Sequence, residues 1–140
     1  MKKIVNVDYK GKMLFEADLN GHKLLMDALP EHGGENKGAT PKSLLLAALA
    51  SCSGMDVVSI LKKMQVEYES LQIRVEGDVA DEHPKKYEAM KVFFIFKGKK
   101  LPLDKIEKAV RLSETTYCGV NATFKPQVEV NFYIELVETE

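Results

Sequence analysis

The sequence predicts an α+β fold in a single domain over residues 1–140, in which an antiparallel-rich β-sheet packs against two main helices. Short runs of alternating apolar and polar residues lie near both ends of the chain, as expected for strands that bury one face. Two longer segments with helix-start signals, 41–64 and 102–117, separate these runs, and this order of elements is typical of α+β proteins. With 140 residues, 45% of them hydrophobic, the chain can bury one substantial core.

Three strands are expected before the first helix. Apolar and polar residues alternate from Val5 to Tyr9, and the pairs Lys10-Gly11 and Asn20-Gly21 have the composition of tight turns. The predicted strands cover residues 5–9, 13–19 and 22–28. The segment 30–38 is rich in glycine and has no apolar periodicity, which predicts a mobile loop of the kind that often borders a site.

The first helix is expected to run from Pro41 to Met64. Thr40 can cap the free backbone N–H groups at its start, and proline is well tolerated as the first helical residue. The helix is apolar on all sides from Leu44 to Ala50. Such a pattern is typical of a buried helix rather than of a helix with one face in water.

Three further strands and a second helix are predicted in the rest of the chain. The segment from Leu71 to Val75 alternates cleanly, which indicates one buried face. Residues 90–96 are apolar on both faces, so they should form a central strand, or a strand whose second face is covered by a helix or a partner subunit. Asp104 and Glu107 have the spacing of a capping box at the start of helix 102–117. Residues 128–136 form the last predicted strand.

Several functional classes are disfavoured by composition and spacing. A net charge of −1 gives no general attraction to nucleic acid or to anionic membranes. Gly33 and Gly38 have the spacing of a phosphate-binding loop, but the required Lys and Ser or Thr do not follow Gly38. No pair of His or Cys residues has the spacing of metal ligands. We therefore expect no bound metal or cofactor and no nucleic-acid partner.

The compartment is inferred from the N-terminus and the apolar runs. The start Met-Lys-Lys is followed by alternating residues rather than by a signal-type apolar block. The longest unbroken apolar stretch is shorter than the roughly 18 to 20 residues that span a bilayer. We expect a cytoplasmic protein without a membrane partner, whose two cysteines are reduced at rest.

The two cysteines, Cys52 and Cys118, are the main candidates for chemistry. A cysteine in an apolar helix is often a packing residue, because free cysteine is among the most buried residue types. The small and polar residues around Cys52 suit a helix that opens there onto a crevice, and Asp56 lies one turn further on. Cys118 could begin a short helical turn, where free backbone N–H groups would favour a thiolate.

Three segments carry a resemblance to a known family. Gly38–Leu45, Ala47–Cys52 and Leu112–Val120 look like the two cysteine motifs of the OsmC/Ohr family, and the expected order of elements agrees over nearly the whole chain. The segment Cys52–Met64 looks most like the less characterised OsmC-like branch. The resemblance implies an intertwined homodimer in which each long helix packs against the partner and the thiol pair lies at the subunit interface.

The same resemblance implies an activity and roles for the thiols. The activity is the thiol-dependent reduction of organic hydroperoxides, a peroxiredoxin-type antioxidant function in oxidative or osmotic stress. Cys52 would attack the peroxide, and Cys118 would resolve the product as a disulfide, which an external dithiol would then reduce. This sequence of steps is chemically sound, since a thiolate gives a sulfenic acid that condenses with a second thiol.

The chain also departs from the pattern of that family. The resemblance implies an activating arginine in the N-terminal strands and a glutamate just after the proline that begins the helix. Here no arginine precedes Arg74, and Lys42 follows the proline. Arg111, seven residues before Cys118, and Asp56, beside Cys52, are candidates to substitute for that pair, and Glu114 in the second motif is a further supporting candidate.

Two alternative functions remain open at the level of the sequence. One is a non-enzymatic protein that binds a small apolar ligand at the dimer interface, with both cysteines as packing residues. The other is a thiol redox switch or disulfide reductase that does not consume peroxide. The missing arginine and glutamate favour the first alternative over an enzyme.

Overall fold

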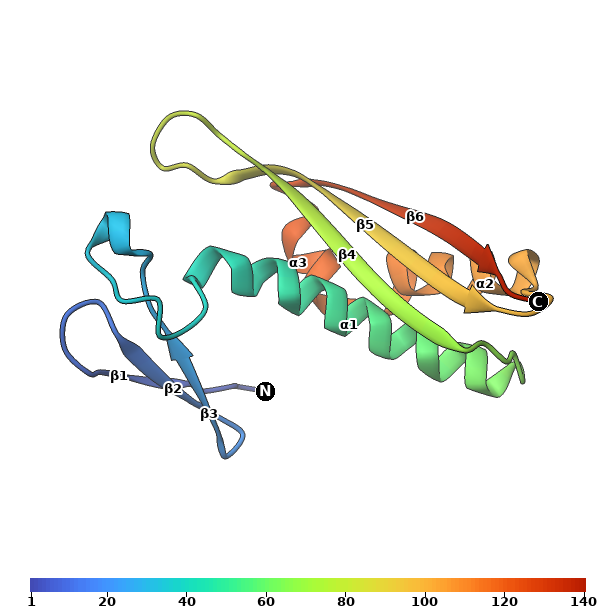
Figure 1. Ribbon diagram of the computed structural model, residues 1–140, viewed down its shortest axis with the longest axis horizontal. Coiled ribbons are helices and arrows are strands. Elements are labelled where there is room, and N and C mark those ends of the chain that lie inside the picture. Colours follow the sequence, from blue (N-terminus) through green and yellow to red (C-terminus); the bar gives the residue numbers. More distant parts are fainter. The chain divides into compact units, whose positions relative to one another are not determined.

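The computed structural model describes all residues from Met1 to Glu140 and divides into two compact units, Met1–Leu45 and Leu46–Glu140. Helices and two separate three-stranded sheets make up the chain, so the predicted α+β class is confirmed (Figure 1). The prediction of one sheet is wrong, because the first three strands and the last three form different sheets. The assignment of residues 1–140 to one domain stays a prediction.

The first unit contains an antiparallel sheet in the order β1-β2-β3, formed by Asn6–Tyr9, Phe15–Leu19 and His22–Met26. The three predicted strands are therefore present, in shorter form. Asn20 and Gly21 connect β2 to β3 with positive φ angles of 53° and 83°, as a two-residue hairpin turn requires. Ala17 is the buried apolar residue of this unit, whereas Val7, Tyr9 and Phe15 are exposed.

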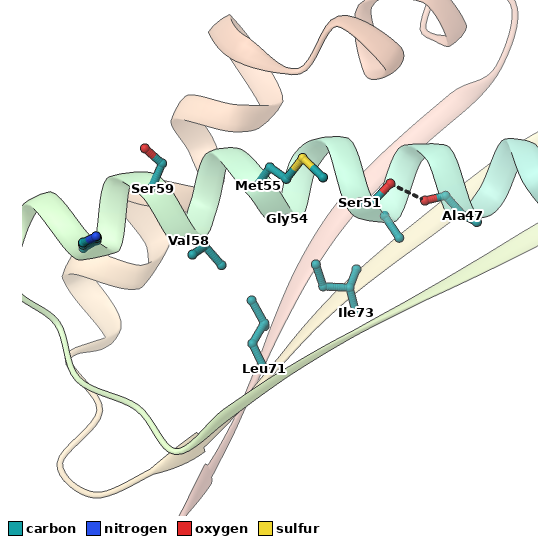
Figure 2. Close-up of a pocket in the computed structure, with 10 residues that line it drawn as sticks. Ala47, Ser51, Gly54, Met55, Val58, Ser59, Leu71 and Ile73 are labelled. Atoms are coloured by element: carbon teal, nitrogen blue, oxygen red, sulfur yellow. Dashed lines mark hydrogen bonds between the residues drawn. The ribbon is translucent and has the colours of Figure 1, made fainter. Parts of the chain in front are cut away.

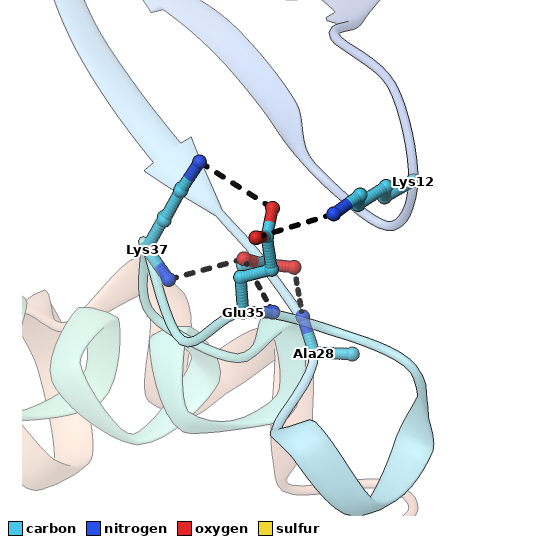
Figure 3. A network of polar contacts seen from close by, with 5 residues as sticks. Lys12, Ala28, Glu35 and Lys37 are labelled. Atoms are coloured by element: carbon cyan, nitrogen blue, oxygen red, sulfur yellow. Dashed lines mark hydrogen bonds and ion pairs between the residues drawn. The ribbon is translucent and has the colours of Figure 1, made fainter.

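The glycine-rich segment after β3 is held by a buried carboxylate. Asp27 accepts hydrogen bonds from the backbone N–H groups of Ala28, Glu35 and Lys37 at 2.7, 3.2 and 3.0 Å (Figure 3). The Glu35 carboxylate forms ion pairs with Lys12 at 3.3 Å and Lys37 at 3.4 Å. A short 3-10 helix, Pro30–His32, lies within the segment. The segment that the sequence predicts to be a mobile loop thus has a defined set of polar anchors.

The second unit contains the sheet β4-β5-β6, formed by Ser70–Val79, Tyr87–Gly98 and Glu129–Glu138. β4 pairs antiparallel with β5, whereas β5 and β6 are parallel. Parallel neighbours need a crossover connection. That connection consists of α2 (Leu103–Leu112), the π-helical turn η2 (Ser113–Tyr117) and α3 (Gly119–Phe124).

The core of the second unit lies between this sheet and the helices. β5 is the central strand, as predicted, and one of its faces is fully buried. The core comprises Met90, Val92, Phe94 and Phe96 of β5, Val130 of β6, Leu49, Val57 and Leu61 of α1 (Pro41–Lys63), and Ile106, Ala109 and Val110 of α2. α1 has the predicted start and ends one residue before the predicted end.

The second apolar face of β5 is only partly covered within this chain, because Phe93 and Ile95 are half-buried. The ring of Phe93 stacks on Tyr133 of β6 with centroids 5.1 Å apart, and the guanidinium carbon of Arg74 from β4 lies 4.6 Å from the Phe93 centroid. Arg74 also forms ion pairs with Glu76 at 3.2 Å and Glu135 at 3.8 Å. An aromatic pair and a cation therefore shield part of this face in the single chain.

α1 is buried on one side only within this chain. A Cβ atom added to Gly54 would lie 2.6 Å from Cδ1 of Ile73, so the glycine permits a close approach of α1 to β4. Met55 and Val58, which line one hollow together with Gly54 and Ile73, are 72% and 42% exposed. The sequence prediction of a helix buried on all sides is therefore wrong for the single chain.

The composition of α1 also corrects the sequence estimate of apolar length. By length and composition alone, Pro41–Lys63 is apolar enough to cross a membrane, although its unbroken apolar runs are short. Core helices of globular proteins can have the same property. Ser53, Gly54, Val57 and Leu61 of α1 are buried. Val57 and Leu61 belong to the core, and Gly54 packs against Ile73 of the sheet.

The start of α2 differs from the prediction. Pro102 occupies the N-cap position and no side chain makes a capping hydrogen bond there, so the predicted capping box of Asp104 and Glu107 is wrong. The reason is positional. Asp104 lies inside the first helical turn, and a capping side chain must come from the residue that precedes the helix.

We predict that replacing Asp27 by Asn destabilises the first unit. The backbone N–H of Lys37, followed by those of Ala28 and Glu35, lowers the pKa of the Asp27 carboxyl below its usual value despite its burial. A depressed folded-state pKa stabilises the protein above the unfolded-state pKa, and that stability is lost as the pH falls through the folded-state value. Thermal unfolding of Asp27→Asn should show a lower Tm at neutral pH and a weaker pH dependence below about pH 4.

The matched control is Asp8→Asn, an exposed carboxylate on β1. It should leave the Tm at neutral pH unchanged. An Asp27→Asn protein with the Tm of the wild type would show that the three hydrogen bonds do not hold the segment.

Candidate thiol site

α1 and the crossover connection bring the two cysteines together. Cys52 is half-buried in the middle of α1, and Cys118 is 4% exposed at the N-cap of α3. Both are free thiols, and their side chains are close enough to form a hydrogen bond with one another. The pair expected from the sequence is thus present as a contact between two elements that are distant in the chain.

The position of Cys118 depends on a change of helix type. α2 ends at Leu112 and continues as the wider turn η2, after which Cys118 adopts an extended conformation with φ −75° and ψ 104°. Its sulfur then accepts a hydrogen bond of 3.4 Å from the backbone N–H of Asn121. The short helical turn that the sequence predicts after Cys118 is confirmed.

The turn favours the Cys118 thiolate as expected, but burial has a larger and opposite effect. Burial raises the pKa of Cys118 to about 11, which outweighs the lowering by the Asn121 N–H. The hydrogen bond with Cys52 and the negative charges of Cys52 and Asp56 raise it further. Cys118 is therefore a protonated thiol at neutral pH, because a short helix start cannot compensate for the loss of solvation.

Asp56 is oriented by a serine that the sequence analysis did not single out. The hydroxyl of Ser113 donates to Oδ2 of Asp56 at 2.9 Å and also lies 3.4 Å from the carbonyl oxygen of Ser53. Ser113 and Ser53 are both fully buried. Ser113 lies within the second cysteine motif, and a polar residue at the end of an apolar helix face was the only sequence signal for it.

Asn121 is a second residue that the sequence analysis missed. It is 1% exposed, and its Nδ2 donates to the backbone carbonyl of Glu114 at 3.0 Å. Its Oδ1 is buried without a hydrogen-bond partner, which is uncommon in folded proteins. Glu114 therefore contributes its backbone carbonyl to this arrangement, and a supporting role for its carboxylate stays a prediction.

Arg111 lies on an exposed part of α2 and forms no ion pair with Asp56. Its backbone carbonyl accepts a hydrogen bond of 2.8 Å from the hydroxyl of Thr115. Because η2 lies between Arg111 and Cys118, the two residues are not two regular α-helical turns apart, as the sequence spacing suggested. A role for Arg111 in activating Cys52 stays a prediction.

Two hollows are relevant to this site. The first, called the Cys118 hollow, has a volume of about 390 Å³ and is lined by Glu114, Thr115, Thr116, Cys118, Ala122, Lys125 and Pro126. The second, called the α1–β4 hollow, has about 820 Å³ and is mainly apolar; its lining includes Ala47, Ala50, Met55, Val58, Leu71 and Ile73 (Figure 2). Neither hollow is lined by Cys52. The His, Cys, Asp and Glu side chains form no group of three or more that could hold a metal ion.

We predict that Asp56→Asn lowers the pKa of Cys118, because the substitution removes a negative charge that disfavours the thiolate. The measurement is the ultraviolet absorbance of the thiolate against pH, in a Cys52→Ser background so that only Cys118 titrates. The control is Glu107→Gln, an exposed carboxylate on α2. An unchanged titration curve in Asp56→Asn would show that the carboxylate does not act on this thiol.

Comparisons with known proteins agree with the sequence resemblance. The family described as OsmC-like protein matches residues 34–132. Protein YhfA of Escherichia coli K12 is 29% identical over 118 residues, which are 84% of this chain and 85% of YhfA. The crystal structure of a hypothetical protein from Aquifex aeolicus has a TM-score of 0.87 at 31% identity and covers 100% of this chain and 99% of its own.

An organic hydroperoxide resistance protein OsmC from Legionella pneumophila has a similar fold. Its TM-score is 0.70 at 17% identity, with 96% of this chain and 97% of that chain covered. At this identity the similarity concerns the fold alone. The family match spans most of the chain and includes both cysteines, and this protein therefore belongs to the OsmC-like protein family.

Proposed function

We propose that this protein is a cysteine-based peroxidase that reduces organic hydroperoxides with Cys52 and Cys118, in defence against oxidative or osmotic stress. The observation that carries the proposal is the side-chain contact between two free thiols at the edge of an apolar core. Relatives of the same fold include organic hydroperoxide resistance proteins, whereas YhfA is a less characterised member of the family. The proposed compartment is the cytoplasm, where thiols are kept reduced.

The proposed reaction has two steps. The Cys52 thiolate attacks the terminal oxygen of the hydroperoxide, the O–O bond breaks, and the alkoxide leaves as an alcohol after taking up a proton. The sulfur of Cys118 then attacks the sulfenic acid on Cys52, forms the disulfide and releases water. Two thiols are oxidised and one peroxide is reduced, so a thiol reductant must restore the pair.

The raised pKa of Cys118 supports this division of roles. Burial keeps Cys118 protonated at neutral pH, and a protonated thiol is a poor nucleophile toward peroxide. Its S–H proton is available for the hydroxide that leaves the sulfenic acid during condensation. Cys118 therefore suits the resolving role, and the exposed fraction of Cys52 suits the attacking role.

The exposed apolar faces support a homodimer. Met55 and Val58 are exposed on α1, where they line the apolar α1–β4 hollow. The first unit likewise exposes Val7, Tyr9 and Phe15. A second copy of the chain that covers α1 would bury Met55 and Val58 and would enclose the α1 segment that carries Cys52.

A ligand-binding function without catalysis is the second candidate. The α1–β4 hollow has the size and the apolar lining of a small-molecule site, with Lys62 as a cationic member of its lining. In this case a small apolar ligand would bind there and both thiols would stay reduced. The thiol redox switch is the third candidate, in which the disulfide forms without turnover of peroxide.

We predict that an organic hydroperoxide at micromolar concentration converts the wild-type protein to a Cys52–Cys118 disulfide, with one peroxide consumed for each disulfide. Peptide mass spectrometry after alkylation identifies the bond. Cys118→Ser should accumulate a sulfenic acid on Cys52, and Cys52→Ser should consume no peroxide. In the same assay Arg111→Ala should slow the oxidation of Cys52 about tenfold if this arginine stabilises the thiolate.

The outcomes separate the three candidates. A wild-type protein that stays reduced would exclude the peroxidase and favour the ligand-binding protein. A disulfide that forms with a disulfide donor but not with peroxide would favour the redox switch. An Arg111→Ala protein with the wild-type rate would remove Arg111 from the mechanism without affecting the rest of the proposal.

We predict that Met55→Arg separates the proposed dimer. A charge at the centre of an apolar interface costs about 2–5 kcal/mol. Light scattering should give about twice the chain mass of 15.7 kDa for the wild type and the single mass for the variant. The control is Lys105→Glu on the exposed face of α2. A monomeric wild type would contradict the proposal.

A further inference from the structure

The two sulfurs of the thiol pair differ in what surrounds them. Cys118 lines the Cys118 hollow directly, although only 4% of its surface is exposed. Cys52 lines neither this hollow nor the α1–β4 hollow. The hydrogen bond from the Asn121 N–H to Cys118 Sγ fixes the sulfur at the N-cap of α3, beside the hollow. A molecule seated in the hollow would thus meet Cys118 before Cys52.

The lining of the Cys118 hollow is mixed, and it is more polar than that of the α1–β4 hollow. Thr115 and Thr116 present exposed hydroxyl groups, which contact one another at 3.2 Å, and Lys125 adds an exposed ammonium group. Glu114 places a carboxylate-bearing residue on the same lining. These groups suit a small hydrophilic molecule and do not suit an alkyl hydroperoxide.

We propose that the Cys118 hollow is the docking site for a small hydrophilic thiol that reduces the oxidised protein by attacking the disulfide at Cys118. The inference rests on the proposed function only in that a Cys52–Cys118 disulfide must form. It assigns separate approaches to the two substrates: the peroxide reaches Cys52, and the reductant reaches Cys118.

The exchange is balanced in two steps. The thiolate of the reductant bonds to Cys118 Sγ, the bond between Cys118 and Cys52 breaks, and the electron pair leaves on the Cys52 sulfur. A second thiol, from the same dithiol or from another molecule, then attacks the reductant's sulfur in the mixed disulfide. The reductant leaves as a disulfide, and the Cys118 sulfur takes up a proton.

The chemistry of leaving groups supports the same direction. In thiol–disulfide exchange the sulfur with the lower pKa leaves faster. Burial raises the pKa of Cys118 to about 11, so its thiolate is a poor leaving group. Attack at Cys118 expels the Cys52 sulfur first and leaves the expulsion of the Cys118 thiolate to the second step, whereas attack at Cys52 requires it in the first step. The position of Cys118 on the lining of the hollow and the order of the leaving groups therefore favour the same sulfur.

The test compares the two sulfurs with an identical leaving group. Cys52→Ser and Cys118→Ser are each converted to the mixed disulfide with thionitrobenzoate, and the release of this chromophore by 2-mercaptoethanol is measured. We expect the adduct on Cys118 to react at least about tenfold faster than the adduct on Cys52, because the hollow admits the attacking thiol. Equal rates, or a faster reaction at Cys52, would overturn the proposal.

A charge variant tests the hollow itself. In the Cys118 adduct, Lys125→Glu should slow the reaction with the anion 3-mercaptopropionate about two- to fivefold at low salt and leave the neutral 2-mercaptoethanol unaffected. Lys105→Glu, whose side chain does not line the hollow, should change neither rate. A Lys125→Glu protein with unchanged rates for both thiols would show that the reductant does not bind here.

These measurements do not depend on the peroxidase reaction. The adducts form with a disulfide reagent rather than with peroxide, so a protein that ignores hydroperoxides can still show faster exchange at Cys118. Failure of the proposed function would appear as no oxidation by peroxide. Failure of this inference would appear as the wrong order of the two exchange rates.

Discussion

The parallel pairing of β5 with β6 is the constraint on which the thiol site depends. Parallel neighbours cannot be joined by a hairpin, so the chain must cross over between the end of one strand and the start of the next. The crossover is made of α2, η2 and α3, and its buried residues share one core with α1 and the sheet. Cys118 lies within this connection and Cys52 lies on α1. The contact between the thiols is therefore a consequence of how the second sheet is built.

The site combines an apolar setting with a small number of polar groups, which shift the pKa of Cys118 in both directions. Burial and the negative charges of Cys52 and Asp56 disfavour its thiolate, while the Asn121 N–H favours it. Burial is the larger effect, so the thiol remains protonated. The Ser113 hydroxyl donates a hydrogen bond to the Asp56 carboxylate. This hydrogen bond between side chains joins η2 to α1.

The apolar residues that remain exposed show that the chain does not cover all of its hydrophobic surface. α1 buries the side with Leu49, Val57 and Leu61 and exposes Met55 and Val58. A helix that is apolar on all sides gains little from facing water, so such a surface is typical of an interface or of a ligand site. The sequence pattern predicts cover on all sides of this helix, and the single chain provides cover on one side only.

The sequence by itself determined the order and type of the elements, because apolar periodicity and turn residues are local properties. It located α1 from Thr40 and Pro41, the β2–β3 turn from Asn20 and Gly21, and the central position of β5 from its two apolar faces. The family followed from the two cysteine motifs for the same reason. Only the tertiary structure decided that the strands form two sheets and that Pro102 occupies the N-cap position of α2 in place of a capping box. It also placed Ser113 and Asn121 near the thiols and Lys125 on the lining of the Cys118 hollow. It also decided the protonation of Cys118, because the solvation of a thiol depends on residues that are distant in the chain and close in space.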